Sequence, residues 1–135
     1  MFEQELPRDP TSAAAARAAL KGRFADSLRG RELETATTLT SELVTNAIRH
    51  GQGRITLRAS LDEDRLLVEV MDEGDGLEQM IRQRRFEHVE GWGLKIVDRE
   101  SSRWGAHEGT THVWFELERA GPRLGAEKNP AAADK

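Results

Sequence analysis

Apolar side chains recur at strand and helix spacings over residues 2–117. The segment 2–6 alternates apolar and polar residues and stops at a proline, which predicts a short edge strand. The segments 13–28 and 31–50 repeat apolar residues three or four positions apart, which predicts two helices. The segments 54–61 and 65–71 alternate again, and the acidic residues 62–64 between them are typical of a hairpin turn.

The second half of the chain is less regular. Residues 77–90 are dense in charge and have no clean period, so we expect a lid there, with a short helix over 77–84. A short helix is predicted over 94–100, followed by a hairpin of strands 102–106 and 111–117. This order of elements predicts an α+β two-layer sandwich, in which helices cover one face of an antiparallel or mixed sheet.

The last residues lack apolar anchors. From Arg119 onward the chain consists mainly of glycine, proline, alanine and charged residues, which predicts a disordered tail. We therefore expect one domain over residues 1–118 and a tail over 119–135.

Composition limits the class of protein. The net charge is −4, which does not suggest a nucleic-acid surface, and the absence of cysteine excludes disulfides and thiolate catalysis. No apolar run approaches the roughly 20 residues needed to cross a bilayer, and the acidic N-terminus is unlike a signal peptide. The expected setting is cytoplasmic, without nucleic acid or membrane as a partner.

Candidate chemistry begins at the end of the second helix. Glu42, Asn46, Arg49 and His50 lie one turn apart, on the face beside the apolar stripe. Taken alone, this row is also consistent with a solvated polar edge and a helix C-cap at Gly51. The other histidines, His88, His107 and His112, have no motif around them and are expected at the surface.

Two glycine motifs add to this row. Asp72-x-Gly74-x-Gly76 follows a strand, where an ionised aspartate can accept a hydrogen bond from an exocyclic amine such as that of adenine; a plain acidic turn is the alternative. Gly91-x-Gly93-Leu94 opens a helix, whose free N–H groups suit phosphates. A Rossmann motif is excluded because its last glycine position is an isoleucine.

The order and spacing of these three motifs resemble the N, G1 and G2 boxes of the GHKL (histidine-kinase-like) ATPase superfamily. The segments SELVTNAIRHG and GWGLKIVDRESSRWG are similar to those of the anti-sigma-factor serine kinases. The resemblance covers about residues 6–117 and implies a Bergerat-type ATP-binding fold.

The resemblance implies a role for each motif residue. Asn46 would ligate Mg²⁺, and Glu42 would be the general base. Asp72 would read adenine, while Gly74 and Gly76 would let the base lie against the end of the sheet. The further nucleotide-binding positions would be Arg49, His50, Gly91, Gly93, Leu94 and one or both of Thr110 and Thr111.

The implied activity is an ATP- and Mg²⁺-dependent serine/threonine kinase that phosphorylates an anti-sigma-factor antagonist and regulates a sigma factor. The presence of Glu42 favours this function, because a module that only binds does not need a carboxylate there. A non-catalytic, nucleotide-gated protein-binding module is the alternative, and ATP hydrolysis without transfer is a third. A sigma factor and its antagonist are the expected partners, and a homodimer stays open.

Overall fold

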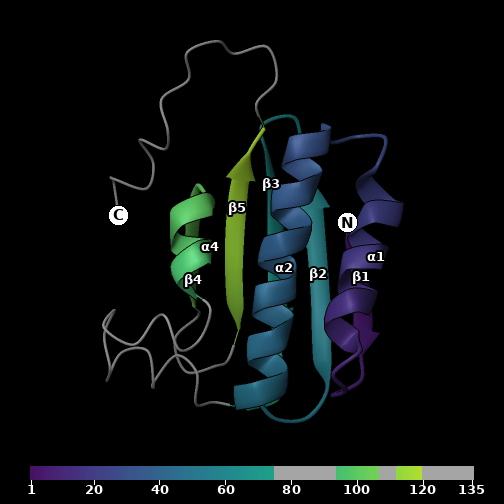
Figure 1. The fold of residues 1–135 in the computed structure, drawn as a ribbon, viewed down its shortest axis with the longest axis vertical. Coiled ribbons are helices and arrows are strands. Elements are labelled where there is room, and N and C mark those ends of the chain that lie inside the picture. The colour runs from purple at the N-terminus through teal and green to yellow at the C-terminus, as the bar shows by residue number, and fades with distance from the viewer. Residues whose placement is uncertain (75–93, 107–111, 120–135) are drawn as a thin grey trace.

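The structure of the protein is a computed structural model that describes residues 1–74, 94–106 and 112–119. Figure 1 shows the order of the elements. They are β1 (Phe2–Leu6), α1 (Ser12–Phe24), α2 (Gly30–His50), β2 (Ile55–Leu61), β3 (Arg65–Met71), α4 (Leu94–Glu100), β4 (Arg103–Ala106) and β5 (Val113–Glu118). The expected lid over 77–90 and the turn over 107–110 lie outside the described residues.

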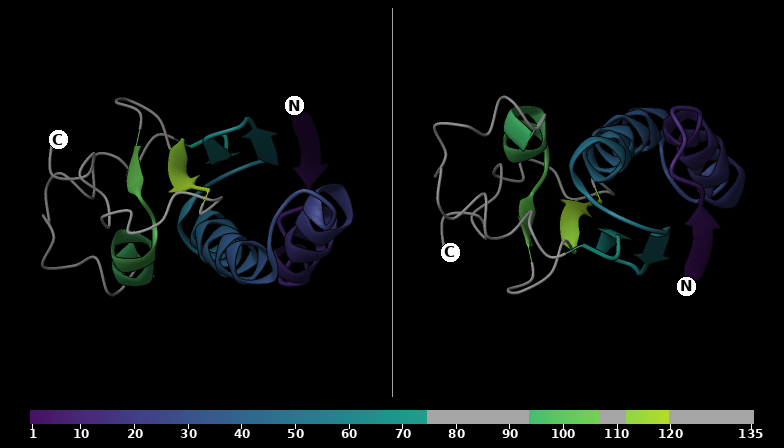
Figure 2. Two further views of the ribbon diagram at one scale, coloured as in Figure 1. Left: turned by 90° about the horizontal axis from the view of Figure 1, so that it is seen from above. Right: turned by 90° about the horizontal axis from the view of Figure 1, so that it is seen from below.

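The five strands form one sheet in the order β1-β2-β3-β5-β4, and every neighbouring pair is antiparallel. The helices α1, α2 and α4 lie on the same side of this sheet (Figures 1 and 2). The predicted α+β two-layer sandwich with helices on one face is therefore confirmed, and the sheet is antiparallel rather than mixed.

The core lies between the two layers. The apolar row of α2 predicted from its spacing is buried, with Leu39 fully inaccessible and Leu43 at 2% exposure. It faces the inward residues of the sheet, which include the fully buried Leu57 and Phe115. On the polar side of the sheet, charged residues pair across strands instead, as Arg58 does with both Glu3 and Glu69.

Helix α1 ends at Phe24, four residues before the predicted end at Leu28. The apolar row still reaches Leu28, which is 7% exposed, because residues 25–28 continue as a turn. The N–H group of Leu28 donates to the carbonyl oxygen of Phe24 at 3.0 Å, as it would in a helix. Apolar spacing therefore predicted the burial correctly and the end of the helix wrongly.

Two residues are less exposed or better anchored than expected. The side chain of His112 is only 17% exposed, and its Nε2 lies 3.0 Å from Glu69, so the predicted surface position is wrong for this histidine. Arg119, predicted to begin the disordered tail, donates to the carbonyl oxygens of Asp62 and Ser27 at 2.9 and 2.7 Å. Residues 120–135 lie outside the described part of the chain.

The topology brings two of the predicted motifs to one end of the molecule. Helix α2 ends at His50, a short loop leads into β2, and the antiparallel β3 returns to the same end at Met71. The end of α2 and the residues after β3 are therefore neighbours. Among the described residues, no helix is long and apolar enough to cross a membrane.

Candidate functional site

The polar row at the end of α2 is partly buried. Asn46 is 4% exposed, and no hydrogen-bond partner for its Nδ2 atom is found among the described residues. Glu42, one turn earlier, is half-buried, and it makes no hydrogen bond or ion pair within the same part of the chain. An unsatisfied buried amide costs about 1–3 kcal/mol of folding free energy. The presence of an asparagine at position 46 is therefore not explained by a contribution to stability.

The last turn of α2 carries Arg49 and His50, both exposed. Partial desolvation of the His50 ring, together with the positive charge of Arg49, lowers the pKa of His50 below its usual value. The imidazole is therefore mainly neutral at pH 7, where it can donate or accept a hydrogen bond. Arg49 is then the permanent positive charge at this end of the row.

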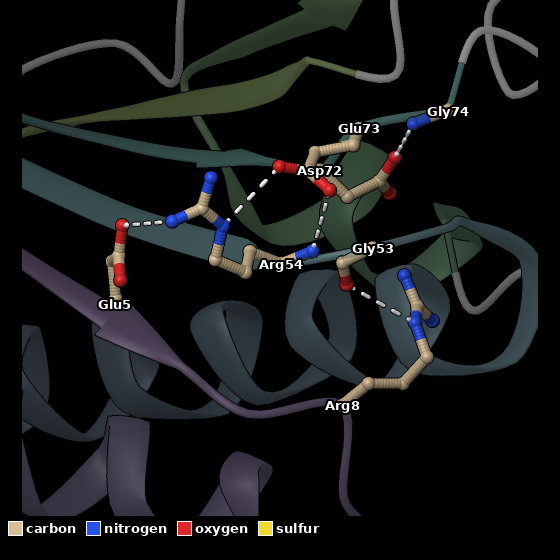
Figure 3. Close-up of polar contacts among 7 residues, drawn as sticks. All are labelled: Glu5, Arg8, Gly53, Arg54, Asp72, Glu73 and Gly74. Carbon is tan, nitrogen blue, oxygen red and sulfur yellow. Dashed lines mark hydrogen bonds and ion pairs between the residues drawn. The ribbon is translucent and has the colours of Figure 1, made fainter.

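Asp72 follows β3 and lies directly against the end of α2. Its Oδ1 atom accepts a hydrogen bond of 2.7 Å from the N–H group of Gly74 (Figure 3). Its Oδ2 atom occupies the space where a side chain on Gly51 would stand, because a Cβ there would be less than 3.0 Å from it. The helix that carries Glu42 and Asn46 and the strand end that carries Asp72 are therefore in contact.

Gly51 is the residue that permits this contact. A Cβ at this position would also lie 2.8 Å from the backbone oxygen of Ala47, which cannot move without the helix. We expect Gly51→Ala to lower the free energy of unfolding by about 1–3 kcal/mol, as overpacking does. We also expect weaker ATP binding, because the carboxylate of Asp72 must shift. Denaturant unfolding and calorimetric titration with ATP measure the two effects.

Gly22→Ala is the matched control, since nothing lies within 4 Å of a Cβ on Gly22 in the last turn of α1. This change is expected to stabilise the protein by about 0.5–1 kcal/mol through helix propensity and to leave ATP binding unchanged. Equal ATP affinity in the Gly51→Ala and Gly22→Ala proteins would contradict the role given to Gly51.

A second set of contacts joins the loop 51–54 to the residues after β3. The N–H group of Glu73 donates to the carbonyl oxygen of Gln52 at 2.7 Å. The Glu73 carboxylate accepts hydrogen bonds from the backbone N–H and the Nε of Arg54, at 3.2 and 3.3 Å (Figure 3). The hydrogen bond from the backbone N–H of Arg54 lowers the pKa of Glu73 most, and the bond from the Arg54 side chain lowers it further. Gly53 has φ +71°, a conformation that favours glycine, and it lies beside the same carboxylate.

Sequence reasoning missed Arg8, in the connector between β1 and α1. Its guanidinium donates to the carbonyl oxygens of Ala47, Ile48 and Gly53. These contacts span 39 to 45 residues of sequence, so no local pattern predicts them. The only local signal was an arginine between two prolines in a connector, which is compatible with many surface roles.

The other predicted positions fall into two groups. Leu94 is the first residue of α4, and its side chain is fully buried in the core. Its N–H group therefore lies in the first turn of a helix, where such groups have no partner within the helix. The remaining predicted positions lie outside the described residues: Gly76, Gly91, Gly93, Thr110 and Thr111.

Comparison with known families identifies the family of the chain. The family model described as "Histidine kinase-, DNA gyrase B-, and HSP90-like ATPase" matches residues 32–127, which is more than half of the chain. The match includes every predicted site residue from Glu42 to Thr111, whereas β1, α1 and Arg8 precede it. A comparison with curated proteins finds no significant match. The chain belongs to the histidine kinase-, DNA gyrase B- and HSP90-like ATPase family, whose fold binds ATP.

Proposed function

We propose that this chain is an ATP-dependent serine/threonine protein kinase of the anti-sigma-factor type. It phosphorylates an antagonist protein and thereby regulates a sigma factor. Membership of the ATPase family supports ATP as the nucleotide. The observation that carries the proposal of transfer is the pair Glu42 and Asn46, one helical turn apart on α2, the helix whose end contacts Asp72.

Asn46 fits the role of a Mg²⁺ ligand. A carboxamide oxygen suits this hard cation. The buried amide nitrogen, which has no partner among the described residues, is a hydrogen-bond donor, so it would pair with an acceptor such as a phosphate oxygen rather than with the cation. Within residues 1–74, 94–106 and 112–119, no group of three or more acidic or histidine side chains gathers as a metal site. Asn46 would therefore act together with phosphate oxygens and water. When bound, Mg²⁺ neutralises charge on the phosphates.

Glu42 fits the role of general base. In the proposed reaction, the hydroxyl oxygen of the acceptor serine or threonine bonds to the γ-phosphorus of ATP, and the bond from that phosphorus to the β–γ bridging oxygen breaks. The hydroxyl proton passes to the carboxylate of Glu42, and ADP leaves. Because Glu42 is half-buried and makes no hydrogen bond within the described part of the chain, its oxygens are available to that proton.

Asp72 fits the recognition of adenine. One carboxylate oxygen is held by the N–H group of Gly74, which fixes the orientation of the side chain at the end of β3. A carboxylate only accepts hydrogen bonds, so it pairs with the exocyclic amine of adenine but not with the oxygen that replaces this amine in inosine. The same side chain therefore gives the site its preference for ATP.

Calorimetric titration tests the nucleotide site. We expect ATP to bind in a Mg²⁺-dependent manner, and ITP to bind about 10- to 100-fold more weakly, the range for a lost hydrogen bond to a charged group. Asp72→Asn should remove most of this difference. Equal binding of ATP and ITP to the unaltered protein would contradict the role of Asp72, and no binding of either nucleotide would overturn the proposal.

The proposal includes the partners and the setting. A sigma factor and an antagonist with an acceptor serine or threonine are the protein partners, and the cytoplasm is the compartment. Transfer of labelled γ-phosphate from ATP to candidate antagonist proteins tests the activity. Nucleotide-dependent binding to such a protein without phosphate transfer would favour the non-catalytic binding module instead.

A further inference from the structure

Arg8 caps the end of the helix that carries the candidate site. Its guanidinium donates to the carbonyl oxygens of Ala47 and Ile48 in the last turn of α2, the latter at 2.7 Å. The carbonyl oxygen of Ala47 also accepts a hydrogen bond of 2.9 Å from the N–H group of Gly51. The last carbonyls of a helix form the negative end of its dipole. The planar, permanently charged guanidinium can satisfy several such acceptors at once.

The same side chain also holds the loop that follows α2. The Nε of Arg8 donates to the carbonyl oxygen of Gly53 at 3.2 Å, and Figure 3 shows the guanidinium below this loop. Arg8 therefore fixes the end of α2 and Gly53 relative to each other. Between these two anchor points lies Gly51, the residue against which Asp72 packs.

The loop is in turn bonded to the residues after β3. The N–H group of Glu73 donates to the carbonyl oxygen of Gln52, and the Glu73 carboxylate accepts hydrogen bonds from Arg54. Arg54 also pairs with Glu5 of β1 at 3.7 Å, so the N-terminal segment reaches the loop at a second point. A displacement of the loop would consequently move the backbone at Glu73, directly after Asp72.

We propose that Arg8 is a positioning residue for the adenine end of the nucleotide site. It acts through the loop 51–53, which sets where the carboxylate of Asp72 stands. This inference rests on the proposed adenine-nucleotide function. Arg8 lies before residue 32, where the match to the ATPase family begins. The positioning contacts that we propose therefore come from the N-terminal segment of this chain, outside the matched region.

Arg119 provides a matched control. It also bridges backbone carbonyls of separate elements, those of Asp62 and Ser27, at 2.9 and 2.7 Å. Asp62 lies in the turn before β3, whereas Asp72 follows β3, so Arg119 acts at the opposite end of that strand. Arg119→Gln removes the same kind of interaction without touching the candidate site.

The test compares Arg8→Gln, Arg8→Lys and Arg119→Gln. The first readout is amide hydrogen exchange at Glu73 and Gly74 without nucleotide, and the second is the ratio of Kd values for ITP and ATP. We expect Arg8→Gln to speed exchange at both amides and to lower the ratio about tenfold, the equivalent of roughly one hydrogen bond. Arg8→Lys, which keeps the charge but not the planar fork, should restore part of the ratio. Arg119→Gln should change neither readout.

The outcomes separate the inference from the function on which it rests. An unchanged ITP-to-ATP ratio in Arg8→Gln, with exchange at Glu73 and Gly74 as in Arg119→Gln, overturns the positioning role while the nucleotide site stands. Failure of the unaltered protein to bind ATP overturns the proposed function, and this inference with it. If Arg8→Gln does not fold, the ratio of Kd values for ITP and ATP in Arg8→Lys is the test. A ratio equal to that of the unaltered protein would then overturn the inference.

Discussion

Glu42→Gln is expected to reduce phosphate transfer to the antagonist protein by about 10²–10⁴-fold, the contribution of a positioned general base. Glutamine has nearly the same shape and a similar helix propensity, so α2 should form as before. Its carboxamide, however, cannot take the proton of the acceptor hydroxyl. Because Glu42 makes no hydrogen bond or ion pair within the described residues, its replacement leaves no described group without a partner.

Single-turnover transfer from labelled ATP, measured beside calorimetric ATP binding, separates chemistry from affinity. The Kd for ATP should be unchanged in Glu42→Gln, since the proton transfer occurs only in the reaction. Glu34→Gln, an exposed acid two turns earlier on α2, is the control and should retain full transfer. Full transfer by Glu42→Gln would remove the catalytic role, and equal losses in both variants would indicate a general charge effect.

Local periodicity accounts for most of the fold that could be predicted. The alternation in 2–6 and 65–71 and the apolar row of α2 identified their elements to within one residue, because half-buried elements show their period directly. The strand order could not be predicted in the same way. In the sheet, β5 lies between β3 and β4. This order depends on the pairing of residues such as Val68 and Phe115, which lie 47 residues apart in sequence.

The candidate site was predictable in its parts but not in its assembly. Gly51 was predicted as a helix cap, which needs only the local pattern. That it also makes room for Asp72 depends on the return of β3 to the same end of the sheet. The role of Arg8 and the burial of His112 beside Glu69 likewise arise from distant residues, and polar contacts of this kind leave no periodic signal.

Asn46→Leu is expected to separate function from stability. The amide nitrogen of Asn46 is buried without a described partner, so an apolar side chain of similar size removes a cost of about 1–3 kcal/mol. The free energy of unfolding should therefore stay the same or rise. The Mg²⁺ dependence of ATP binding should disappear, because leucine has no oxygen to offer the cation.

Thr40→Val is the matched control for this variant. The hydroxyl of Thr40 is fully buried in the same helix, and it too has no partner among the described residues. Its removal should likewise leave stability unchanged or improved, but Mg²⁺ should still strengthen ATP binding. Thermal unfolding and titration with ATP, each with and without Mg²⁺, give both quantities. A less stable Asn46→Leu protein that keeps its Mg²⁺ dependence would make Asn46 a structural residue. A stable protein that has lost this dependence would show that Asn46 lowers the stability of the fold but is needed for ligand binding. Such a conflict between stability and binding is expected at a functional site.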